Sequence, residues 1–414
     1  MISNLKQGSK YSVETKDEVL EGVYVNSDKD FIYLKQDSGY NLGVSRKKVK
    51  NFTLLKEKKE SKEKSKKQGK GEIVILHTGG TIASRVDYST GAVSNSFTPE
   101  ELLEMFPELE DIASIESELI FNKSSEDLDF KDYNEIAKVI DKHVKRSGVR
   151  GIILTHGTDT MHFTASALSF ALEGLTKPVV LVGSQRSSDR PSSDASLNLF
   201  NAAFFAKQQL PGVFICMHEN VNDEACLIHS GLNARKMHSS RRDAFESINR
   251  KAVARVDYSK DKVEWIEKPE EQKEEYSLKL FDEKISVGWL KSRPGLKAEE
   301  VAFYDKYDAL LLEGTGLGHF PLKDDNEKVY KNLKAIAKNK PVAMTTQTLK
   351  GRVNLNVYSH GRALKDIGVI GHNLDMTPET AYVKLNWLLS NYKDRVKELY
   401  SENLRGELSE RSDL

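Results

Sequence analysis

Two clusters of hydroxyl side chains follow short apolar runs, and side chains of this kind can attack or hold a carbonyl group. The first cluster, His77–Thr81 (HTGGT), follows the run 73–76, and the second, Thr155–Thr160 (THGTDT), ends the run 151–155. Glycine lets the backbone turn sharply beside a ligand, and a hydroxyl near backbone N–H groups is placed for attack on a carbonyl. Thr81 alone could equally be a turn residue that bonds its own backbone. Two such clusters together favour a catalytic site.

A threonine hydroxyl is a weak nucleophile and needs a base. Asp159 directly follows Thr158, and Lys236 lies in the polar segment GLNARKMHSSRRDAF. A lysine that is neutral in its surroundings can accept the hydroxyl proton while a carboxylate orients it. Spacing alone does not separate Lys236 from its neighbours Arg235 and His238, so the choice among the three stays open at this point.

The clusters must be positioned by the elements that precede them. Ligands bind beyond the carboxyl ends of strands in an open parallel sheet. Consecutive apolar residues suit parallel strands buried on both faces, and such runs occupy residues 73–76, 151–155, 178–183, 212–217, 309–314 and 341–346. Helical patterns lie between them, including one predicted from a cap at Asp132 to an end at Gly148. The pattern predicts an α/β fold.

The N-terminal part of the chain has a different texture. Residues 1–55 contain short β-branched or aromatic runs separated by turn clusters, which predicts a small five-stranded barrel or open sheet that serves as a docking module. Residues 56–70 contain eight Lys and three Glu and no apolar side chain. This composition predicts a solvated linker, with contact to an RNA backbone as the alternative.

Composition excludes several classes of protein. A chain of 414 residues is too long for one ordinary core, and its net charge of zero argues against a uniformly basic nucleic-acid binder. Cys216 and Cys226 are too few for a disulfide framework or a cysteine metal site, so buried thiols are expected. No apolar run reaches membrane-spanning length, and no secretory signal, phosphate-binding G-x-x-x-x-G-K-[ST] or metal-binding H-E-x-x-H is present. A cytoplasmic enzyme without a metal or ATP of its own fits best.

The motifs resemble those of a known family. HTGGTIAS with ILTHGTDTM resembles the paired signatures of the bacterial-type L-asparaginase/glutaminase family, and VGSQRSSDRPSSDASLNLFNA resembles its third segment. The resemblance covers residues 71–395. It implies an asparaginase-like two-lobe parallel-sheet fold, with an N-terminal lobe at 71–265 that holds the active site, a connector at 266–284 and a C-terminal lobe at 285–414. The small all-β barrel-like domain precedes these lobes.

The resemblance also implies roles for individual residues. They are Thr81 as the nucleophile, Thr158, Asp159 and Lys236 as a second triad, Ser125 as the binder of the substrate's α-carboxylate, and Tyr88 as a lid tyrosine. Asp159 would also hold the α-amino group. Ser124 is adjacent to Ser125 and is the alternative if the alignment slips by one, and His156 is expected to be structural. The segment GRVNLNVYSHG lacks the glutamate that a neighbouring subunit supplies to the amine site in many members.

A narrower resemblance joins the β-module, the lysine-rich linker and TGGTIASRVDYSTGAV. Together they resemble the D subunits of archaeal-type glutamyl-tRNA(Gln) amidotransferases. This implies a glutaminase that supplies ammonia to a partner, the amidotransferase E subunit, which converts Glu-tRNA(Gln) to Gln-tRNA(Gln) with ATP and Mg²⁺. It also implies a homodimer within a heterotetramer. The alternatives are a free-standing cytoplasmic L-asparaginase with an added domain and a non-catalytic tRNA-docking scaffold.

Overall fold

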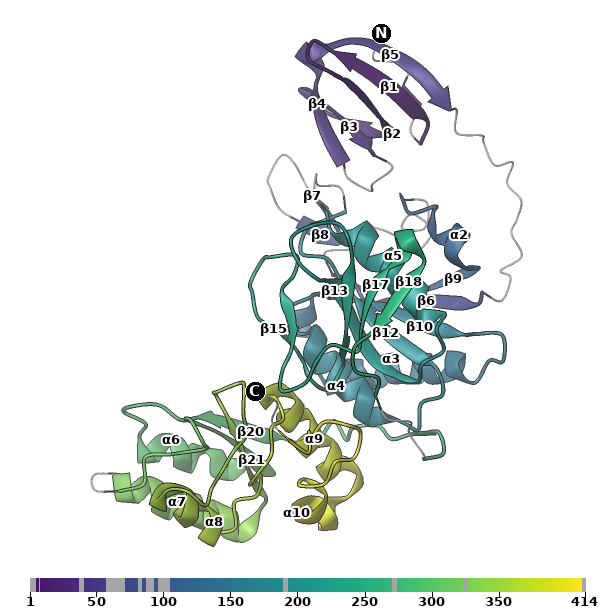
Figure 1. Ribbon diagram of the computed structural model, residues 1–414. Helices are drawn as coiled ribbons and strands as arrows, with labels where there is room; N and C mark the ends of the chain where they lie inside the picture. The colour runs from purple at the N-terminus through teal and green to yellow at the C-terminus, as the bar shows by residue number, and fades with distance from the viewer. Residues whose placement is uncertain are drawn as a thin grey trace.

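The computed structural model arranges the chain as a small N-terminal sheet, a large central lobe and a smaller C-terminal lobe (Figure 1). It describes residues 5, 6, 8–36, 41–56, 71–80, 84–86, 93–95, 105–188, 193–269, 274–323 and 326–411. Thr81, Tyr88 and all of the expected linker except Lys56 lie outside the described residues. Among the described residues, no helix is long and apolar enough to cross a membrane.

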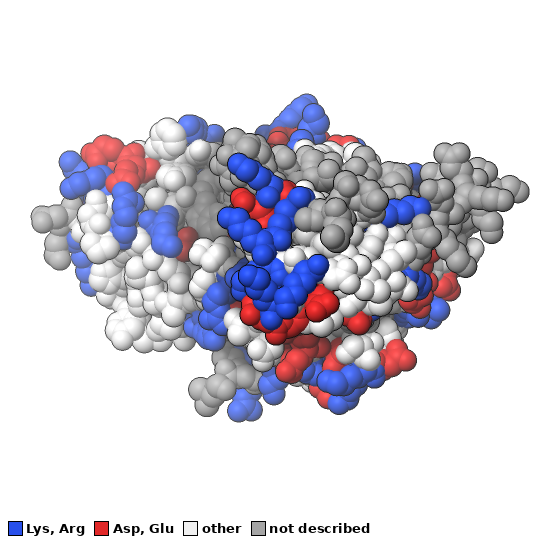
Figure 2. All heavy atoms as spheres, turned by 90° about the horizontal axis from the view of Figure 1, so that it is seen from above, with Lys and Arg blue, Asp and Glu red and all other residues white. Residues whose placement is uncertain are grey.

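The N-terminal part forms a five-stranded antiparallel sheet, as the sequence predicts. Its strands, in the order β4-β3-β2-β1-β5, are β1 (Lys10–Thr15), β2 (Val19–Ser27), β3 (Phe31–Lys35), β4 (Asn41–Ser45) and β5 (Val49–Lys56). Its core consists of Tyr11, Val13, Ile32, Leu34 and Val44. In the view of the whole molecule from above, basic side chains gather in the middle of the visible face, with acidic side chains beside them (Figure 2). This face of the molecule therefore carries charges of both signs.

The large lobe is built on an eight-stranded sheet in the order β18-β17-β14-β13-β12-β10-β6-β9. The strands are β6 (Ile73–His77), β9 (Ile115–Leu119), β10 (Gly151–Thr155), β12 (Pro178–Val182), β13 (Gly212–His218), β14 (Cys226–Ser230), β17 (Ala254–Asp257) and β18 (Lys262–Trp265). The five strands from β9 to β13 are parallel, and the remaining three extend the sheet in antiparallel fashion. Every residue of β6, β10 and β12 is buried, which explains their uninterrupted apolar runs.

Helices cover both faces of this sheet. One face packs against α3 (Phe130–Val144) and α4 (Met161–Ala171), and the other packs against α2 (Leu109–Ile112) and α5 (Ala195–Ala206). The remaining described strands of the lobe form short antiparallel pairs: β7 (Ser84–Val86) with β8 (Val93–Asn95), β15 (Ala234–Lys236) with β16 (Phe245–Ser247), and β11 (Leu172–Glu173) with β19 (Ser277–Leu278). The expected α/β fold is confirmed.

The predicted boundaries of α3 were wrong by a few residues. The helix is capped by Asp129, whose side chain accepts from the backbone N–H groups of Lys131 and Asp132. Asp132 instead reaches back to the N–H of Asp129 and completes a capping box. The C-cap is Lys145, three residues before Gly148. From the sequence alone, either of two aspartates three residues apart can be the cap of a helix. Only the reciprocal hydrogen bonds in the structure decide between them.

The C-terminal lobe has a three-stranded parallel sheet in the order β20-β21-β22. Its elements are β20 (Val287–Lys291), α6 (Ala298–Phe303), β21 (Ala309–Gly314), α7 (Glu327–Asn339), β22 (Val342–Thr346), α8 (Ser359–Asp366), α9 (Pro378–Asn391) and α10 (Val396–Leu399). Helix α9 packs against α4 of the large lobe, where the hydroxyls of Ser166 and Thr380 are 2.8 Å apart. The two lobes therefore share a packed boundary.

Candidate active site

The two threonine clusters meet at the carboxyl ends of the neighbouring strands β6 and β10. The Thr78 hydroxyl donates to the Thr155 carbonyl at 2.8 Å. Gly80 has a positive φ of 86°, and a Cβ on it would lie 2.5 Å from the backbone nitrogen of Gly157. This close approach requires glycine, so the first turn packs directly on the second. Thr81 follows Gly80 in the sequence but lies outside the described residues.

Three of the expected site residues form a hydrogen-bonded group. The Lys236 ammonium nitrogen donates to Thr158 Oγ1 at 2.8 Å and to Asp159 Oδ1 at 2.6 Å. The Lys236 side chain is 10% exposed, whereas that of Asp159 is 66% exposed. Strand β15 thus carries the lysine from a distant part of the sequence to the turn after β10.

The geometry separates Lys236 from the two neighbours that spacing could not exclude. Successive side chains of a strand point to opposite faces, and Arg235 pairs instead with Glu379 of α9, its nitrogen 3.1 Å from the carboxylate. The ring of His238 accepts from the backbone N–H groups of Ser240 and Arg241 in an exposed loop. Of the three, Lys236 alone points to Thr158.

Ser125 lies beside the same turn. It is buried, and a Cβ added to Gly157 would lie 2.8 Å from its Oγ. Its carbonyl accepts from the Thr160 hydroxyl at 2.6 Å, which fixes its segment against the turn. The adjacent Ser124 is exposed. The structure therefore brings Ser125, rather than Ser124, against the turn that carries Thr158.

His156 is bound on both ring nitrogens. Its Nδ1 donates to the Gly157 carbonyl at 2.7 Å, and its Nε2 lies 2.8 Å from the Thr164 hydroxyl. Burial lowers the pKa of His156 to about 4, so the ring is neutral at pH 7. A neutral ring with both nitrogens engaged supports the turn and has no free group for catalysis.

Two further residues close to the group were not singled out from the sequence. Burial, followed by the charges of Arg235 and Lys236, lowers the pKa of His162 to about 3. Glu379 is 6% exposed and receives Arg235 across the boundary between the lobes. Neither shows a signal in the sequence, because His162 reads as part of a helix and Glu379 lies more than a hundred residues from β15.

Metal and thiol chemistry find no support in the described part of the chain. There, no group of three or more His, Cys, Asp or Glu side chains could hold a metal ion. Cys216 and Cys226 are both free and buried. The arrangement of hydroxyls, amine and carboxylate instead suits attack on a carbonyl group and hydrolysis of the product.

Three protein families match the chain in succession. The GatD N-terminal domain matches residues 5–55, "Asparaginase, N-terminal" matches residues 72–271, and the "Glutaminase/Asparaginase C-terminal domain" matches residues 286–399. The matched segments correspond to the small sheet, the large lobe and the C-terminal lobe.

Curated relatives match over nearly the whole length. The D subunit of the glutamyl-tRNA(Gln) amidotransferase of Pyrococcus furiosus is 44% identical over 99% of this chain and 93% of the relative. The corresponding D subunit of Methanococcus maripaludis is 42% identical over 97% of this chain and 98% of the relative. That of Archaeoglobus fulgidus is 40% identical over 98% of this chain and 96% of the relative.

Solved structures of L-asparaginases have a similar fold. The thermostable L-asparaginase of Thermococcus kodakarensis superposes with a TM-score of 0.72 at 32% identity and covers 82% of this chain and 99% of its own. L-asparaginase I of Vibrio cholerae gives a TM-score of 0.68 at 29% identity, with 81% of this chain and 98% of its own covered. Both cover nearly all of their own length but leave a part of this chain unmatched.

Proposed function

The chain belongs to the asparaginase family and, within it, to the D subunits of glutamyl-tRNA(Gln) amidotransferases, and on this basis we propose how its site releases ammonia from glutamine. The chain is an amidohydrolase that serves a tRNA-dependent amidotransferase. Its product ammonia is used to convert Glu-tRNA(Gln) to Gln-tRNA(Gln).

One observation favours this function over a free-standing asparaginase. The match to the asparaginase structure from Thermococcus kodakarensis covers 99% of that structure but only 82% of this chain. The matches to the three amidotransferase relatives cover 97% or more of this chain. The segment 5–55 matches the GatD N-terminal domain and folds as a separate sheet. An appended domain shared with amidotransferase subunits has no place in a plain asparaginase.

The mechanism that we propose divides the work among the expected residues. Ser125 and the exposed carboxylate of Asp159 hold the α-carboxylate and α-amino group of glutamine. The Thr81 oxygen attacks the side-chain amide carbon, backbone N–H groups hold the oxyanion, and a proton transferred to the amide nitrogen lets the C–N bond break and ammonia leave. Water, activated through Thr158 and Lys236, then cleaves the ester to glutamate. Tyr88 would close the site during these steps.

The surroundings of this reaction are also proposals. The amidotransferase E subunit would bind ATP and Mg²⁺, activate the glutamate of Glu-tRNA(Gln) and receive the ammonia, and this chain would need no cofactor. Two copies of the chain would form a homodimer within a heterotetramer. Because aminoacyl-tRNA is made and consumed in the cytoplasm, the complex would act there.

The experiment is to measure ammonia release from glutamine and from asparagine by the full-length chain, alone and with the partner E subunit and Glu-tRNA(Gln). We expect weak release by the chain alone and glutamine turnover that rises when both are added. Asp159→Asn should abolish glutamine-dependent amidation and leave amidation with added ammonium intact. Brisk asparagine hydrolysis that is indifferent to both additions would instead identify an asparaginase. Loss of ammonium-dependent amidation in a folded variant would contradict the division of labour.

A further inference from the structure

A buried network begins at the turn that supports Thr158. Gly183 directly follows β12, and a Cβ on it would lie 2.9 Å from Thr158 Cγ2 and 2.7 Å from the His156 carbonyl oxygen. The Gly183 carbonyl accepts from the Asn198 side-chain amide at 2.9 Å. Asn198 lies on α5 and is completely buried. The position of the turn against Thr158 therefore depends on Asn198.

Asp194, the residue before α5, holds the same turn. Its buried carboxylate accepts from the backbone N–H groups of Gln185 at 2.9 Å and Arg186 at 3.0 Å. It also receives the Asn198 amide at 3.2 Å. Two side chains at the start of one helix thus fix both the carbonyl and the N–H groups of the turn.

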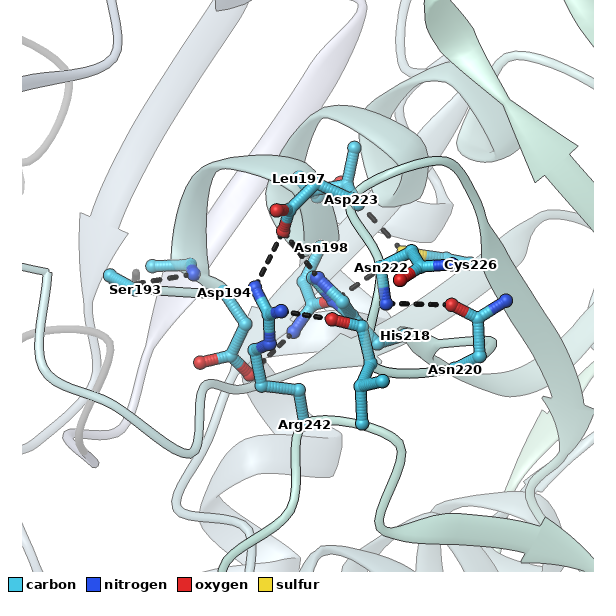
Figure 3. Close-up of polar contacts among 12 residues, drawn as sticks. Ser193, Asp194, Leu197, Asn198, His218, Asn220, Asn222, Asp223, Cys226 and Arg242 are labelled. Atoms are coloured by element: carbon cyan, nitrogen blue, oxygen red, sulfur yellow. Dashed lines mark hydrogen bonds and ion pairs between the residues drawn. The ribbon is translucent and has the colours of Figure 1, made fainter. Parts of the chain in front are cut away.

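His218 bonds to the other end of Asn198 (Figure 3). Its Nδ1 lies 2.6 Å from Asn198 Oδ1, and because this oxygen only accepts, Nδ1 carries the proton. Its Nε2 faces Asp223 Oδ1 at 3.3 Å. Burial, followed by the charge of Arg242, lowers the pKa of His218 to about 3, so the ring is neutral at pH 7. His218 thus stands between the turn at Thr158 and the hairpin loop that carries Asp223.

His218 does not serve as a base that activates the cysteine of this network. The Cys226 thiol donates to Asn198 Oδ1 at 3.3 Å, and burial raises its pKa well above the usual value. The thiol is therefore protonated, and the ring nitrogens of His218 are directed to Asn198 and Asp223 instead. The network positions groups and does not itself perform chemistry.

Arg242 closes the network toward the catalytic lysine. It donates to Asp223 Oδ1 at 2.6 Å and to the Val221 carbonyl. Arg242 lies in the loop between β15 and β16, six residues after Lys236. Lys236 itself donates to Thr158 at 2.8 Å, so the segment that carries Lys236 and Arg242 contacts both Thr158 and the Asp223 loop.

We propose that His218 is a positioning residue for amide hydrolysis: its Nδ1–H, 2.6 Å from Asn198 Oδ1, orients the Asn198 amide, whose other end holds the turn at Thr158. This inference rests on the proposed function, because it assigns Thr158 and Lys236 to the reaction. A misplacement of about 1 Å at reacting groups can cost about a hundredfold in rate. Removal of the His218 ring would therefore affect the chemical step more than glutamine binding, because Ser125 and Asp159 bind the substrate.

The test compares three substitutions of His218 in the full-length chain assembled with its partner subunit. In His218→Asn the new amide can replace Nδ1 and donate to Asn198, whereas His218→Gln and His218→Leu lose that donor. We expect His218→Leu and His218→Gln to lower kcat for glutamine about tenfold to a hundredfold with KM within about threefold. His218→Asn should keep kcat within about threefold of the wild type. The matched control is His143→Leu. His143 is as buried as His218, but it lies on α3, bonds to Glu118 and is not part of the network.

Several results would overturn the inference. One is a kcat of His218→Asn no higher than that of His218→Gln. Another is a loss of kcat in His143→Leu equal to that in His218→Leu at matched loss of melting temperature. Failure of all three His218 variants to fold would assign the residue to stability alone. If Lys236→Ala retains full glutaminase activity, the proposed site itself is wrong. If Lys236→Ala is inactive but His218→Leu is fully active, only the positioning role falls.

Discussion

Replacing Lys236 by arginine should abolish glutamine hydrolysis nearly as completely as replacing it by alanine. The amine nitrogen lies 2.8 Å from the Thr158 hydroxyl and 2.6 Å from Asp159. To accept a proton from Thr158 the amine must be neutral. Arginine keeps the positive charge and can still bind Asp159, but it is not deprotonated in proteins. The arginine variant therefore separates proton transfer from charge.

The expected size of the effect follows from the geometry. A positioned general base contributes about 10²- to 10⁴-fold, which corresponds to roughly 3–5 kcal/mol at about 1.4 kcal/mol per tenfold. The Lys236 side chain is only 10% exposed, so bulk water cannot easily replace it. We expect kcat to fall about a thousandfold in Lys236→Ala and to within about tenfold of that value in Lys236→Arg. KM should change less, because Ser125 is untouched.

The assay is ammonia release from glutamine by the full-length chain with its partner and Glu-tRNA(Gln). Amidation driven by added ammonium reports on folding and assembly and should be unchanged. Lys260→Arg and Lys260→Ala are matched controls, because Lys260 is 67% exposed and pairs with Asp257 at 2.8 Å on the surface. If Lys236→Arg keeps more than about a tenth of the wild-type kcat, the lysine acts through its charge and the reasoning is refuted.

Two predictions concern stability. Glu407→Gln should lower the free energy of unfolding by about 3–5 kcal/mol, since it leaves the fully buried Lys384 ammonium, 2.5 Å from the carboxylate, without its counter-charge. Urea unfolding measures this, and a loss below about 1 kcal/mol would contradict it. The melting temperature should also fall as the pH drops from about 6.5 toward 4, and a flat profile there would refute the argument. Burial lowers the pKa of five histidines to about 3 or 4, so between about pH 6.5 and 4 these side chains bind protons only in the unfolded chain. Their contribution to the free energy of unfolding is therefore complete above the ordinary pKa of 6.5 and is lost as the pH falls. The five residues are His77, His156, His162, His218 and His229.

The sequence predicts the parallel strands well because strands buried on both faces cannot avoid apolar residues. It also places both threonine clusters at strand ends, because each cluster follows an apolar run. The glycine at position 80 is required because Gly80 packs closely against Gly157. It could not choose between Arg235 and Lys236, because that choice depends on which face of β15 meets Thr158 and which meets a helix of the other lobe. The role of His218 is equally invisible, since its partners come from α5 and from the loop on the other side of β13.

The N-terminal sheet is joined to the catalytic lobe by more than a linker. The Lys35 ammonium donates to the Met105 carbonyl at 2.6 Å and lies 4.6 Å from the centre of the Phe106 ring. Phe106 in turn packs edge-on against Phe200, with ring centres 6.1 Å apart. Phe200 lies on α5, the helix that carries Asn198 and so holds the turn at Thr158. Burial lowers the pKa of Lys35, and Glu108, 3.9 Å away, opposes that shift. The domain that separates this chain from free-standing asparaginases thus contacts the segment at Met105 and Phe106, and Phe106 packs on the helix that holds the turn at Thr158.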